Sequence, residues 1–327
     1  MAKITVLGAG GWGMALALSA YNSGHNVTLW SPFEEEVKML QEKRTNEKLL
    51  RDVFLPSNIK ITTDISVTSD DNLTIIATPS IAVRSVAKKL AQYRKSGIVL
   101  NVSKGFEADS LKFLSDVIKE EIPGATVVAL SGPSHAEEVA RNIPTSIVAA
   151  SLSLPAAQVV QDIMTGEALR VYTSTDLVGV ELGGALKNVI AIAAGLCDGL
   201  GLGDNTKAAL ITRGLAEMTR LGVCIGAKEF TFAGLAGIGD LVVTCTSRHS
   251  RNNRFGFKVG SGMSVKEALE AVGTVEGYYA AENAYRLSQK YNVELPIIRE
   301  CYGVLYKGND VKNCVNNLMN RPSRSEH

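Results

Sequence analysis

The residue of this chain most suited to acid–base chemistry is a lysine with no other cation near it in sequence. Lys187 is the only basic residue between Val178 and Leu202, a stretch built mostly of small and apolar residues. Burial disfavours the charged form of an ammonium, so these surroundings would lower its pKa from about 10.4 towards values useful for general acid–base catalysis. Two other interpretations stay open: the side chain reaches solvent from an amphipathic helix, or it pairs with Glu181.

A glycine-rich turn near the N-terminus has the spacing of a dinucleotide site. Residues 8–13 read Gly-Ala-Gly-Gly-Trp-Gly, directly after an apolar strand and at the start of a helix. Gly8 permits the tight turn, Gly10 lets the backbone approach a pyrophosphate, and Gly13 allows close packing of helix on strand. The helix N-terminus adds free N–H groups and the positive end of a dipole. This turn predicts NAD or NADP as the cofactor.

The end of the second strand does not decide between the two dinucleotides. An acidic residue there would bind the ribose 2′-hydroxyl of NAD, and an arginine would favour the 2′-phosphate of NADP. The sequence at that point is Ser31-Pro32-Phe33, with neither. Glu34 comes slightly too late and is better placed in the first turn of the next helix, where a carboxylate complements the dipole.

A run of arginines is the candidate site for a phosphate. Arg248, Arg251 and Arg254 recur every three residues. They could form a solvated helical face, a nucleic-acid patch or a substrate-phosphate site. The chain has 34 basic and 33 acidic residues, a net charge of +1, which gives no global field for nucleic acid and favours a small ligand. His135 is interpreted as a capping or packing residue, and no His, Cys and carboxylate cluster suggests a metal.

The pattern of elements predicts two domains. Short apolar strands alternate with amphipathic helices in the first half, which is typical of a Rossmann-like α/β domain whose mostly parallel sheet is covered on both faces. From about Thr175 the pattern is helical only. We therefore expect a dinucleotide-binding domain over 1–174 and an all-α substrate and catalytic domain over 175–327. The expected strands are Ile4–Leu7, Val27–Trp30, Leu73–Ala77, Ile98–Val102, Val127–Leu130, Ser146–Ala149 and Arg170–Thr173, and the expected helices of the second half are Val178–Leu200, Thr206–Ile225, Val265–Val272, Ala280–Tyr291 and Ile297–Tyr306.

Composition narrows the class of protein. The five cysteines are scattered and form no CxxC pair, which is not typical of a disulfide framework or a zinc site. The N-terminus runs straight into a strand without the apolar core of a signal peptide, so a cytoplasmic protein is expected. The Val178–Leu202 stretch approaches membrane-spanning length, but its charges and glycines favour a buried core helix, and no membrane insertion is expected.

Four polar segments resemble one enzyme family. They include the motifs SGPSHAEEVA from Ser131, GALKNVIAIAAG from Gly184 and AGIGDLVVTC from Ala236. Together they resemble the bacterial-type NAD(P)-dependent glycerol-3-phosphate dehydrogenases over nearly the whole chain. The resemblance implies that the protein interconverts dihydroxyacetone phosphate and sn-glycerol 3-phosphate for glycerophospholipid synthesis, as a homodimer.

The resemblance also implies a role for individual residues. Lys187 matches the proton donor and acceptor, Lys104 matches a residue that contacts both cofactor and substrate, and Asp240 matches an acid beside the reacting centre. In these positions Lys104 would lower the pKa of Lys187 by repulsion and Asp240 would raise it by attraction. The implied substrate contacts are Lys104, Gly132, Ser134, Lys187, Asp240 and the phosphate group Ser250, Arg251 and Asn252. The implied cofactor contacts are Gly11, Trp12, Lys104, Ala136, Arg251 and Glu276, which add to Gly8, Gly10 and Gly13 of the glycine turn.

Two alternatives remain at this stage. A related two-domain dehydrogenase acting on a hydroxy-carboxylate would use the same glycine turn and helix lysine, and would differ at Ser250–Asn252. A dinucleotide-binding sensor without turnover would bind the cofactor and show no substrate-dependent change in absorbance.

Overall fold

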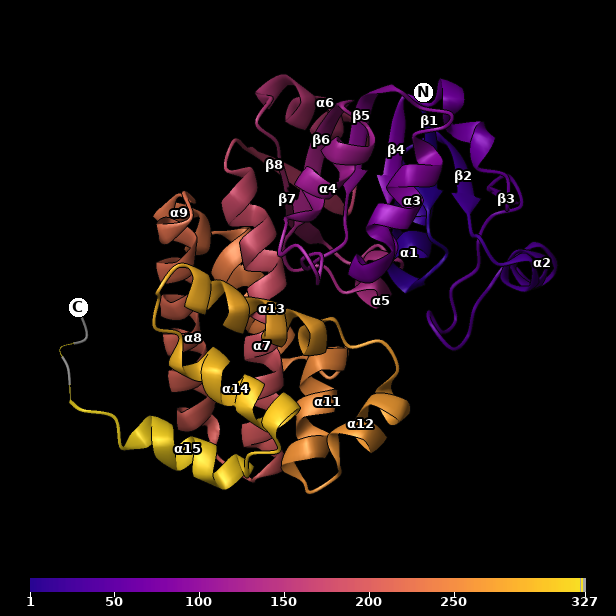
Figure 1. The fold of residues 1–327 in the computed structure, drawn as a ribbon. Helices are drawn as coiled ribbons and strands as arrows, with labels where there is room; N and C mark the ends of the chain where they lie inside the picture. Colours follow the sequence, from indigo (N-terminus) through magenta and orange to yellow (C-terminus); the bar gives the residue numbers. More distant parts are fainter. Residues whose placement is uncertain (324, 326–327) are drawn as a thin grey trace.

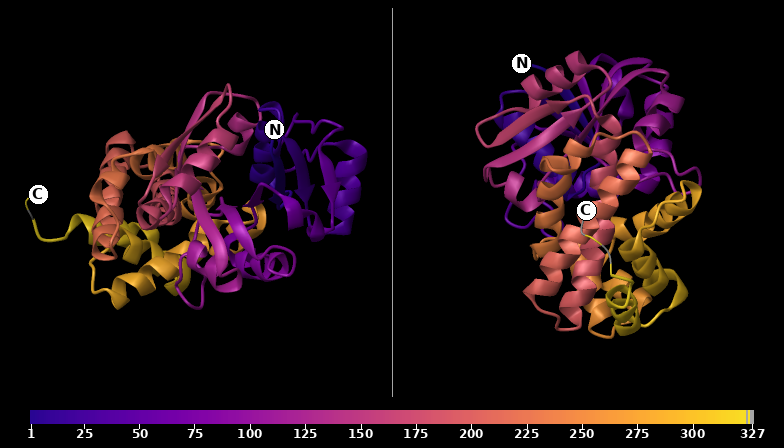
Figure 2. Two further views of the ribbon diagram at one scale, coloured as in Figure 1. Left: turned by 90° about the horizontal axis from the view of Figure 1, so that it is seen from above. Right: turned by 90° about the vertical axis from the view of Figure 1, so that its left-hand side faces the viewer.

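The computed structural model describes residues 1–323 and Ser325. The chain forms a sheet domain followed by a helical domain, which lie one above the other in Figure 1 and in the right-hand view of Figure 2. The last strand ends at Ser174 and the first long helix of the second domain begins at Leu177.

One sheet of eight strands organises the first domain, in the order β3-β2-β1-β4-β5-β6-β7-β8. All neighbouring strands run parallel except β6 and β7, which are antiparallel. Leu7, at the end of β1, is in register with Trp30 of β2 and Ile76 of β4, so these carboxyl ends share one edge. The strands are β1 Lys3–Leu7, β2 Asn26–Trp30, β3 Lys60–Thr62, β4 Leu73–Ile76, β5 Ser96–Asn101, β6 Gly124–Ser131, β7 Thr145–Ala150 and β8 Leu169–Ser174.

Helices cover both faces of the sheet because successive strand residues point to opposite sides. Ile4 and Val6 of β1 join the core under α1 and α6, whereas Leu7 joins the core under α3 and α4. The α-helices of this domain are α1 Gly11–Asn22, α2 Glu34–Lys43, α3 Val83–Leu90, α4 Leu114–Glu121, α5 Ala136–Val139 and α6 Leu154–Met164, with short 3-10 turns η1 Ile65–Asp70 and η2 Ser80–Ala82.

A single buried helix, α7, is the centre of the second domain, and α8, α10, α11 and α13 pack around it. Glycines let α11 approach it closely: a Cβ on Gly195 would lie 2.1 Å from the Asn253 carbonyl oxygen, and one on Gly199 would lie 2.4 Å from that of Phe257. The helices are α7 Leu177–Gly199, α8 Asp204–Cys224, α9 Glu229–Phe232, α10 Asp240–Thr246, α11 Arg251–Gly260, α12 Val265–Val272, α13 Glu276–Lys290, α14 Pro296–Lys307 and α15 Val311–Met319, with a π-helical turn η3 at Leu235–Gly239.

Two segments of the described chain pass a length and hydropathy test for crossing a membrane, Leu177–Gly199 and Glu229–Thr246. In the first, 89% of the apolar window is buried inside the protein, as a core helix requires. The second is interrupted at Gly237, whose backbone is not helical. The length and apolar composition of α7 are therefore explained by its packing inside the protein.

The predicted fold class is confirmed, with local corrections. Every predicted strand is present, but β3 was missed because it has only three residues. The start of α13 lies at Glu276, one turn before the predicted Ala280, and the short helices α9, α10, α11 and α15 were not predicted. A helix of two turns gives too few periodic positions to stand out in a sequence.

Candidate active site

Lys187 lies in the middle of α7 and is only 6% exposed. Its ammonium donates hydrogen bonds to Asp240 Oδ1 and, at 2.8 Å, to Thr244 Oγ1. Glu181 does not pair with it: that carboxylate accepts hydrogen bonds from the hydroxyl and, at 3.0 Å, the backbone N–H of Ser115 in the sheet domain. Both open alternatives, a solvent-exposed lysine and a Lys187–Glu181 pair, are therefore wrong.

Two glycines on α7 give Lys187 its neighbours. Gly183 and Gly184 lie four and three residues before it, hence on the same helical face. A Cβ on Gly183 would meet the Ala236 carbonyl oxygen at 2.4 Å, and one on Gly184 would meet Ser131 Oγ at 3.0 Å and Lys104 Cγ at 3.4 Å. The turn before Asp240 and the loop after β5 can therefore both reach α7 beside its lysine.

Asp240 connects the two domains at this point. It is 1% exposed, at the start of α10, and its Oδ2 lies 2.7 Å from the Nζ of Lys104 in the loop after β5. Lys104 Nζ also donates to the Gly132 carbonyl oxygen at 3.3 Å, and Ser134 Oγ donates to the same carbonyl at 2.8 Å. The carboxyl ends of β5 and β6 thus meet α7 and α10 around one carboxylate shared by two ammonium groups.

The charges of this cluster make Lys187 its titrating group. Burial lowers the pKa of Lys187 to about 7, and repulsion from Lys104 acts in the same direction, against the attraction of Asp240. Burial would raise the pKa of Asp240, but the two ammonium groups outweigh it and hold that pKa below its usual range. Asp240 is therefore ionised, while Lys187 can gain or lose a proton near neutral pH.

The glycine turn fits the pyrophosphate of a dinucleotide. Gly8 has φ +124°, and a Cβ there would lie 2.6 Å from the Ala77 carbonyl oxygen; one on Gly13 would lie 1.9 Å from that of Gly8. A Cβ on Gly10, in contrast, would meet no atom within 4 Å. Gly10 is the N-cap of α1 and no side chain caps the helix. The backbone is thus packed on one side and open on the other, where the first N–H groups of α1 have no acceptor among the residues that the structure describes.

Other predicted cofactor residues lie near this turn or between the domains. Gly11 opens α1, and a Cβ on it would lie 3.9 Å from that of Ala136 at the start of α5. Trp12 packs on the core under α1. Glu276 begins α13 and accepts a hydrogen bond at 3.1 Å from the backbone N–H of Ser80, which follows β4. Glu276 thus reaches the same sheet edge from the helical domain.

The predicted phosphate group forms the N-terminus of α11. Ser250 is the N-cap, and its Oγ accepts from the Asn253 N–H at 3.2 Å. Asn252 uses its side chain internally, because Nδ2 donates to Asn188 Oδ1 and Oδ1 accepts from the Gly277 N–H, both at 2.9 Å. Burial raises the pKa of Glu276, against the hydrogen bonds from Ser80 and the charge of Arg251. Arg251 itself is exposed.

Sequence reasoning missed Thr244 as a partner of Lys187. It follows Asp240 by four residues, so both side chains lie on one face of α10, and that spacing was the available signal. His135 is the N-cap residue of α5 as expected, although its side chain makes no capping hydrogen bond. Burial and, to a smaller extent, Lys187 lower the pKa of His135. Within the described residues, no group of three His, Cys, Asp or Glu side chains could hold a metal ion.

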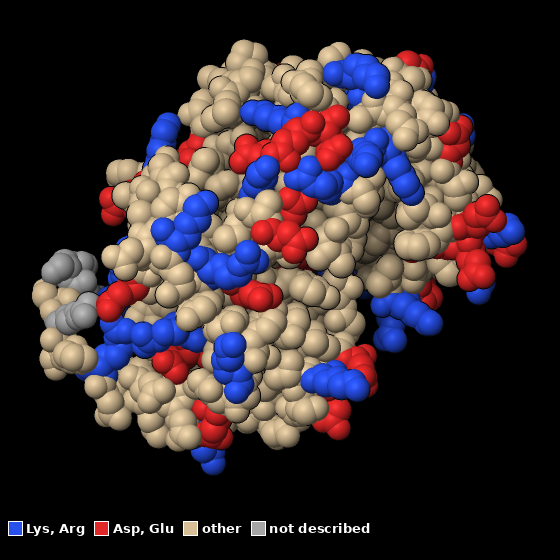
Figure 3. All heavy atoms as spheres, in the orientation of Figure 1, with Lys and Arg blue, Asp and Glu red and all other residues tan. Residues whose placement is uncertain are grey.

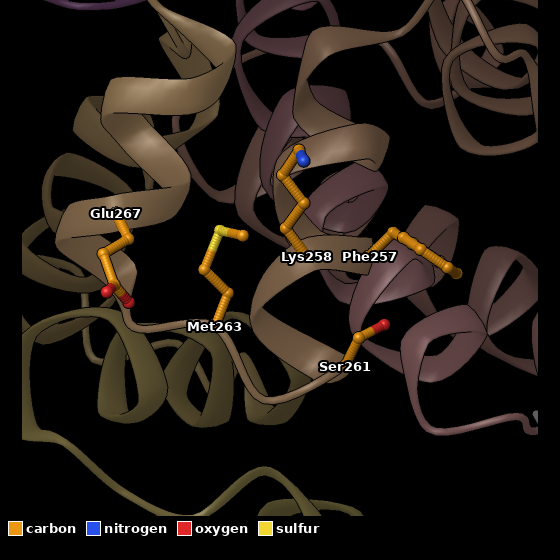
Figure 4. Close-up of a pocket in the computed structure, with 5 residues that line it drawn as sticks. All are labelled: Phe257, Lys258, Ser261, Met263 and Glu267. Atoms are coloured by element: carbon orange, nitrogen blue, oxygen red, sulfur yellow. The ribbon is translucent and has the colours of Figure 1, made fainter.

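A surface hollow of about 550 Å³ lies elsewhere, between the end of α11 and the start of α12. Figure 4 shows Lys258 and Glu267 on opposite sides of Met263 there. This hollow is at the C-terminal end of α11, whereas Ser250 and Arg251 are at the N-terminus of that helix. The hollow is lined by one cation, Lys258, and one anion, Glu267. The space-filling view of Figure 3 shows a second hollow between the two domains, with acidic and basic side chains mixed over the visible face. The chemistry described above lies between the domains.

Comparison with known proteins agrees with these features over the whole chain. Residues 3–157 match the family described as NAD-dependent glycerol-3-phosphate dehydrogenase N-terminus, and residues 176–316 match the corresponding C-terminus. A relative from Thermoanaerobacter sp. (strain X514), named glycerol-3-phosphate dehydrogenase for NAD(P)+, is 50% identical, and the alignment covers 99% of this chain and 98% of that protein.

Solved structures give the same result. The crystal structure of glycerol-3-phosphate dehydrogenase from Coxiella burnetii has a TM-score of 0.94 and 37% identity, covering 98% of this chain and 99% of that one. D-mandelate dehydrogenase, solved with NADH and anilino(oxo)acetate, has a TM-score of 0.64 at 16% identity, covering 96% of this chain and 99% of that one, which is a likeness of fold alone. This chain belongs to the family of NAD-dependent glycerol-3-phosphate dehydrogenases.

Proposed function

We propose that this protein is an oxidoreductase that interconverts dihydroxyacetone phosphate and sn-glycerol 3-phosphate with NAD(H) or NADP(H), and that Lys187 is its general acid and base. The relatives' names support the reaction. The observation that carries the assignment of Lys187 is its burial beside a carboxylate that it shares with Lys104. An isolated structural ion pair has no need of a second ammonium on the same carboxylate.

Reduction of a ketone adds a hydride to carbon and a proton to oxygen. The reduced nicotinamide supplies the hydride when bound. Lys187, as an ammonium, stabilises the negative charge that develops on the carbonyl oxygen and donates its proton to that oxygen. Asp240 and Thr244 hold the nitrogen in place throughout, because both bond to it. In the direction of oxidation, the neutral amine of Lys187 accepts the hydroxyl proton.

The N-terminus of α11 is the proposed phosphate site. The backbone N–H groups of Arg251 and Asn252 donate to no acceptor in the described part of the chain, and they lie at the positive end of the helix dipole. The exposed guanidinium of Arg251 adds a planar fork that matches phosphate oxygens. Binding the remote phosphate orients the small carbonyl for attack. Gly132 and Ser134 complete the proposed substrate contacts, through the backbone around the Lys104 loop.

The proposed cofactor site joins both domains. Its members, besides Lys104, are Gly8, Gly10, Gly11, Trp12, Gly13, Ala136, Arg251 and Glu276. Supporting this grouping, a Cβ on Gly11 would nearly touch Ala136, and Glu276 bonds Ser80 after β4. The boundary between the domains is proposed at residues 174 and 175, between β8 and α7.

The proposal extends to the setting of the enzyme. We propose a cytoplasmic homodimer without membrane insertion, whose product supplies glycerophospholipid synthesis. The resemblance to bacterial-type enzymes of this family supports the dimer and the pathway. The burial of 89% of the apolar window of α7 supports a globular enzyme.

Oxidation of NADH and NADPH, followed by absorbance, tests the proposed reaction. Dihydroxyacetone phosphate is expected to trigger oxidation, whereas ketopantoate and phenylglyoxylate are not. A preference for a keto acid would instead favour a hydroxy-carboxylate dehydrogenase, and dinucleotide binding without turnover on any of these substrates would favour a sensor.

A further inference from the structure

A carboxylate lies at the end of β2, although no acidic residue directly follows that strand in the sequence. Ser31 directly follows β2, is fully buried, and donates its hydroxyl hydrogen to the carboxylate of Glu36. Glu36 is the third residue of α2, so its side chain folds back from the first turn of the helix towards the strand. Glu34, the earlier candidate, begins α2 as predicted and has an exposed side chain.

The strand end to which this carboxylate is bonded contacts the glycine turn. The Gly8 N–H donates to the Trp30 carbonyl oxygen at 2.9 Å, so the turn that fits the pyrophosphate and the residue before Ser31 are in direct contact. In dinucleotide-binding domains, the ribose nearest the adenine lies between the glycine turn and the end of the second strand. We therefore infer that the Glu36 carboxylate, which is bonded to Ser31, faces the region of the ribose 2′ position.

The surroundings give this position a negative character. Glu34, Glu35 and Glu36 all lie in the first turn of α2. Asp64, after the neighbouring strand β3, has a pKa lowered mainly by its hydrogen bonds to Ser66, and it is ionised at neutral pH. Arg44 is directed away, because its guanidinium donates to the carbonyl oxygens of Ser57 and Ile59.

We propose that Glu36 is a specificity-determining residue that makes this enzyme prefer NAD(H) to NADP(H). The Glu36 carboxylate can accept a hydrogen bond from a ribose 2′-hydroxyl, whereas it repels a 2′-phosphate, which carries up to two negative charges. This inference rests on the dehydrogenase function proposed above and deepens it. The opposing interpretation is purely structural: a carboxylate in the first turn of a helix also stabilises that helix through the dipole.

Direct titration of both dinucleotides separates these interpretations without requiring turnover. NADH and NADPH are titrated into the native protein, Glu36→Gln and the matched control Glu34→Gln, with nicotinamide fluorescence as the signal. The native protein is expected to bind NADH at least about tenfold more tightly than NADPH, a difference of about 1.4 kcal/mol. Glu36→Gln is expected to strengthen NADPH binding about tenfold and to change NADH binding little. Glu34→Gln removes an exposed charge of the same helix turn, which solvent screens, and is expected to change the ratio of the two affinities far less.

Several results would overturn the inference. They are equal or tighter binding of NADPH by the native protein, the same change of ratio in Glu36→Gln and Glu34→Gln, or an equal loss of both dinucleotides in Glu36→Gln with a lower melting temperature. Should Glu36→Gln not fold, Ser31→Ala replaces it, since loss of the Ser31 hydroxyl frees the Glu36 carboxylate. The preference of Ser31→Ala for NADH over NADPH is expected to narrow several-fold. An unchanged preference would count against Glu36 as the specificity-determining residue. Dihydroxyacetone phosphate turnover by the native protein is measured in parallel, so failure of the dehydrogenase function is recognised separately.

Discussion

Replacing Asp240 by asparagine removes the negative charge between the buried ammonium of Lys187 and the half-buried ammonium of Lys104, and keeps the shape of the side chain. Breaking a buried ion pair by removing one partner costs about 3–5 kcal/mol. The protein can relieve this cost by releasing a proton from Lys187, whose pKa burial already lowers to about 7. At about 1.4 kcal/mol per tenfold change, the alkaline limb of the pH profile for reduction, where the rate falls as Lys187 loses its proton, should move at least about two pH units towards acid.

The assay is the pH dependence of kcat/KM for reduction of dihydroxyacetone phosphate. Reduction requires the ammonium, so the native rate is expected to fall as the pH rises through about 7. At pH 7 about half of the native protein carries Lys187 as an ammonium, compared with at most about one part in a hundred of Asp240→Asn. The rate of the variant at pH 7 is therefore expected to be about fifty-fold lower than native, and to recover towards pH 5. Asp198→Asn is the control, because it removes a carboxylate that pairs with Lys207 at 2.7 Å outside the cluster. A folded Asp240→Asn enzyme whose alkaline limb stays at the native pH would show that Asp240 does not set the pKa of Lys187.

Three further predictions concern the cofactor turn, the phosphate site and the helical core. Gly13→Ala is expected to destabilise the protein by about 1–3 kcal/mol, since its Cβ would lie 1.9 Å from the Gly8 carbonyl oxygen. Gly10→Ala should keep the native melting temperature and weaken NADH binding about tenfold. Equal melting temperatures of the two variants would contradict this. Arg251→Ala should raise KM for dihydroxyacetone phosphate at least about tenfold with little change in melting temperature, and an unchanged KM would argue against a phosphate contact. Burial raises the pKa of Glu217 to about 7, above its ordinary value of 4.5, so the folded state holds the proton more tightly. Glu217 therefore contributes stability that is present below about pH 4.5 and is lost as the pH rises through about 7, in total about 3 kcal/mol. Denaturant unfolding of Glu217→Gln should show a free energy of unfolding that depends less on pH over that window. An unchanged pH dependence would exclude the ionisation of Glu217 as its cause.

The parts of the site that lie in local motifs were predictable. The glycine turn occupies six consecutive residues, so its flanking strand and helix could be identified together. Lys187 stood out because α7 is otherwise apolar, and the pattern that marked it also predicted the helix. Lys104 and Asp240 were assigned by resemblance, and the structure brings both to Lys187.

What the sequence could not reveal depends on contacts between distant segments. Lys187 and Asp240 are 53 positions apart, and only the packing of the η3 turn against Gly183 places them together. Asn252 was assigned to phosphate, yet its side-chain amide bonds Asn188 and Gly277, which leaves only its backbone N–H for an anion. Glu36 reaches the end of β2 by a side-chain conformation, and residue spacing holds no information about that.

The central claim is that Lys187 transfers the proton. The most direct test is the steady-state rate of dihydroxyacetone phosphate reduction by Lys187→Met, which keeps an unbranched side chain in the same buried space, measured together with NADH binding and the melting temperature. We expect a loss of about a thousandfold or more in kcat, with NADH affinity within about threefold of native. Near-native kcat in a folded Lys187→Met enzyme that binds NADH would contradict it.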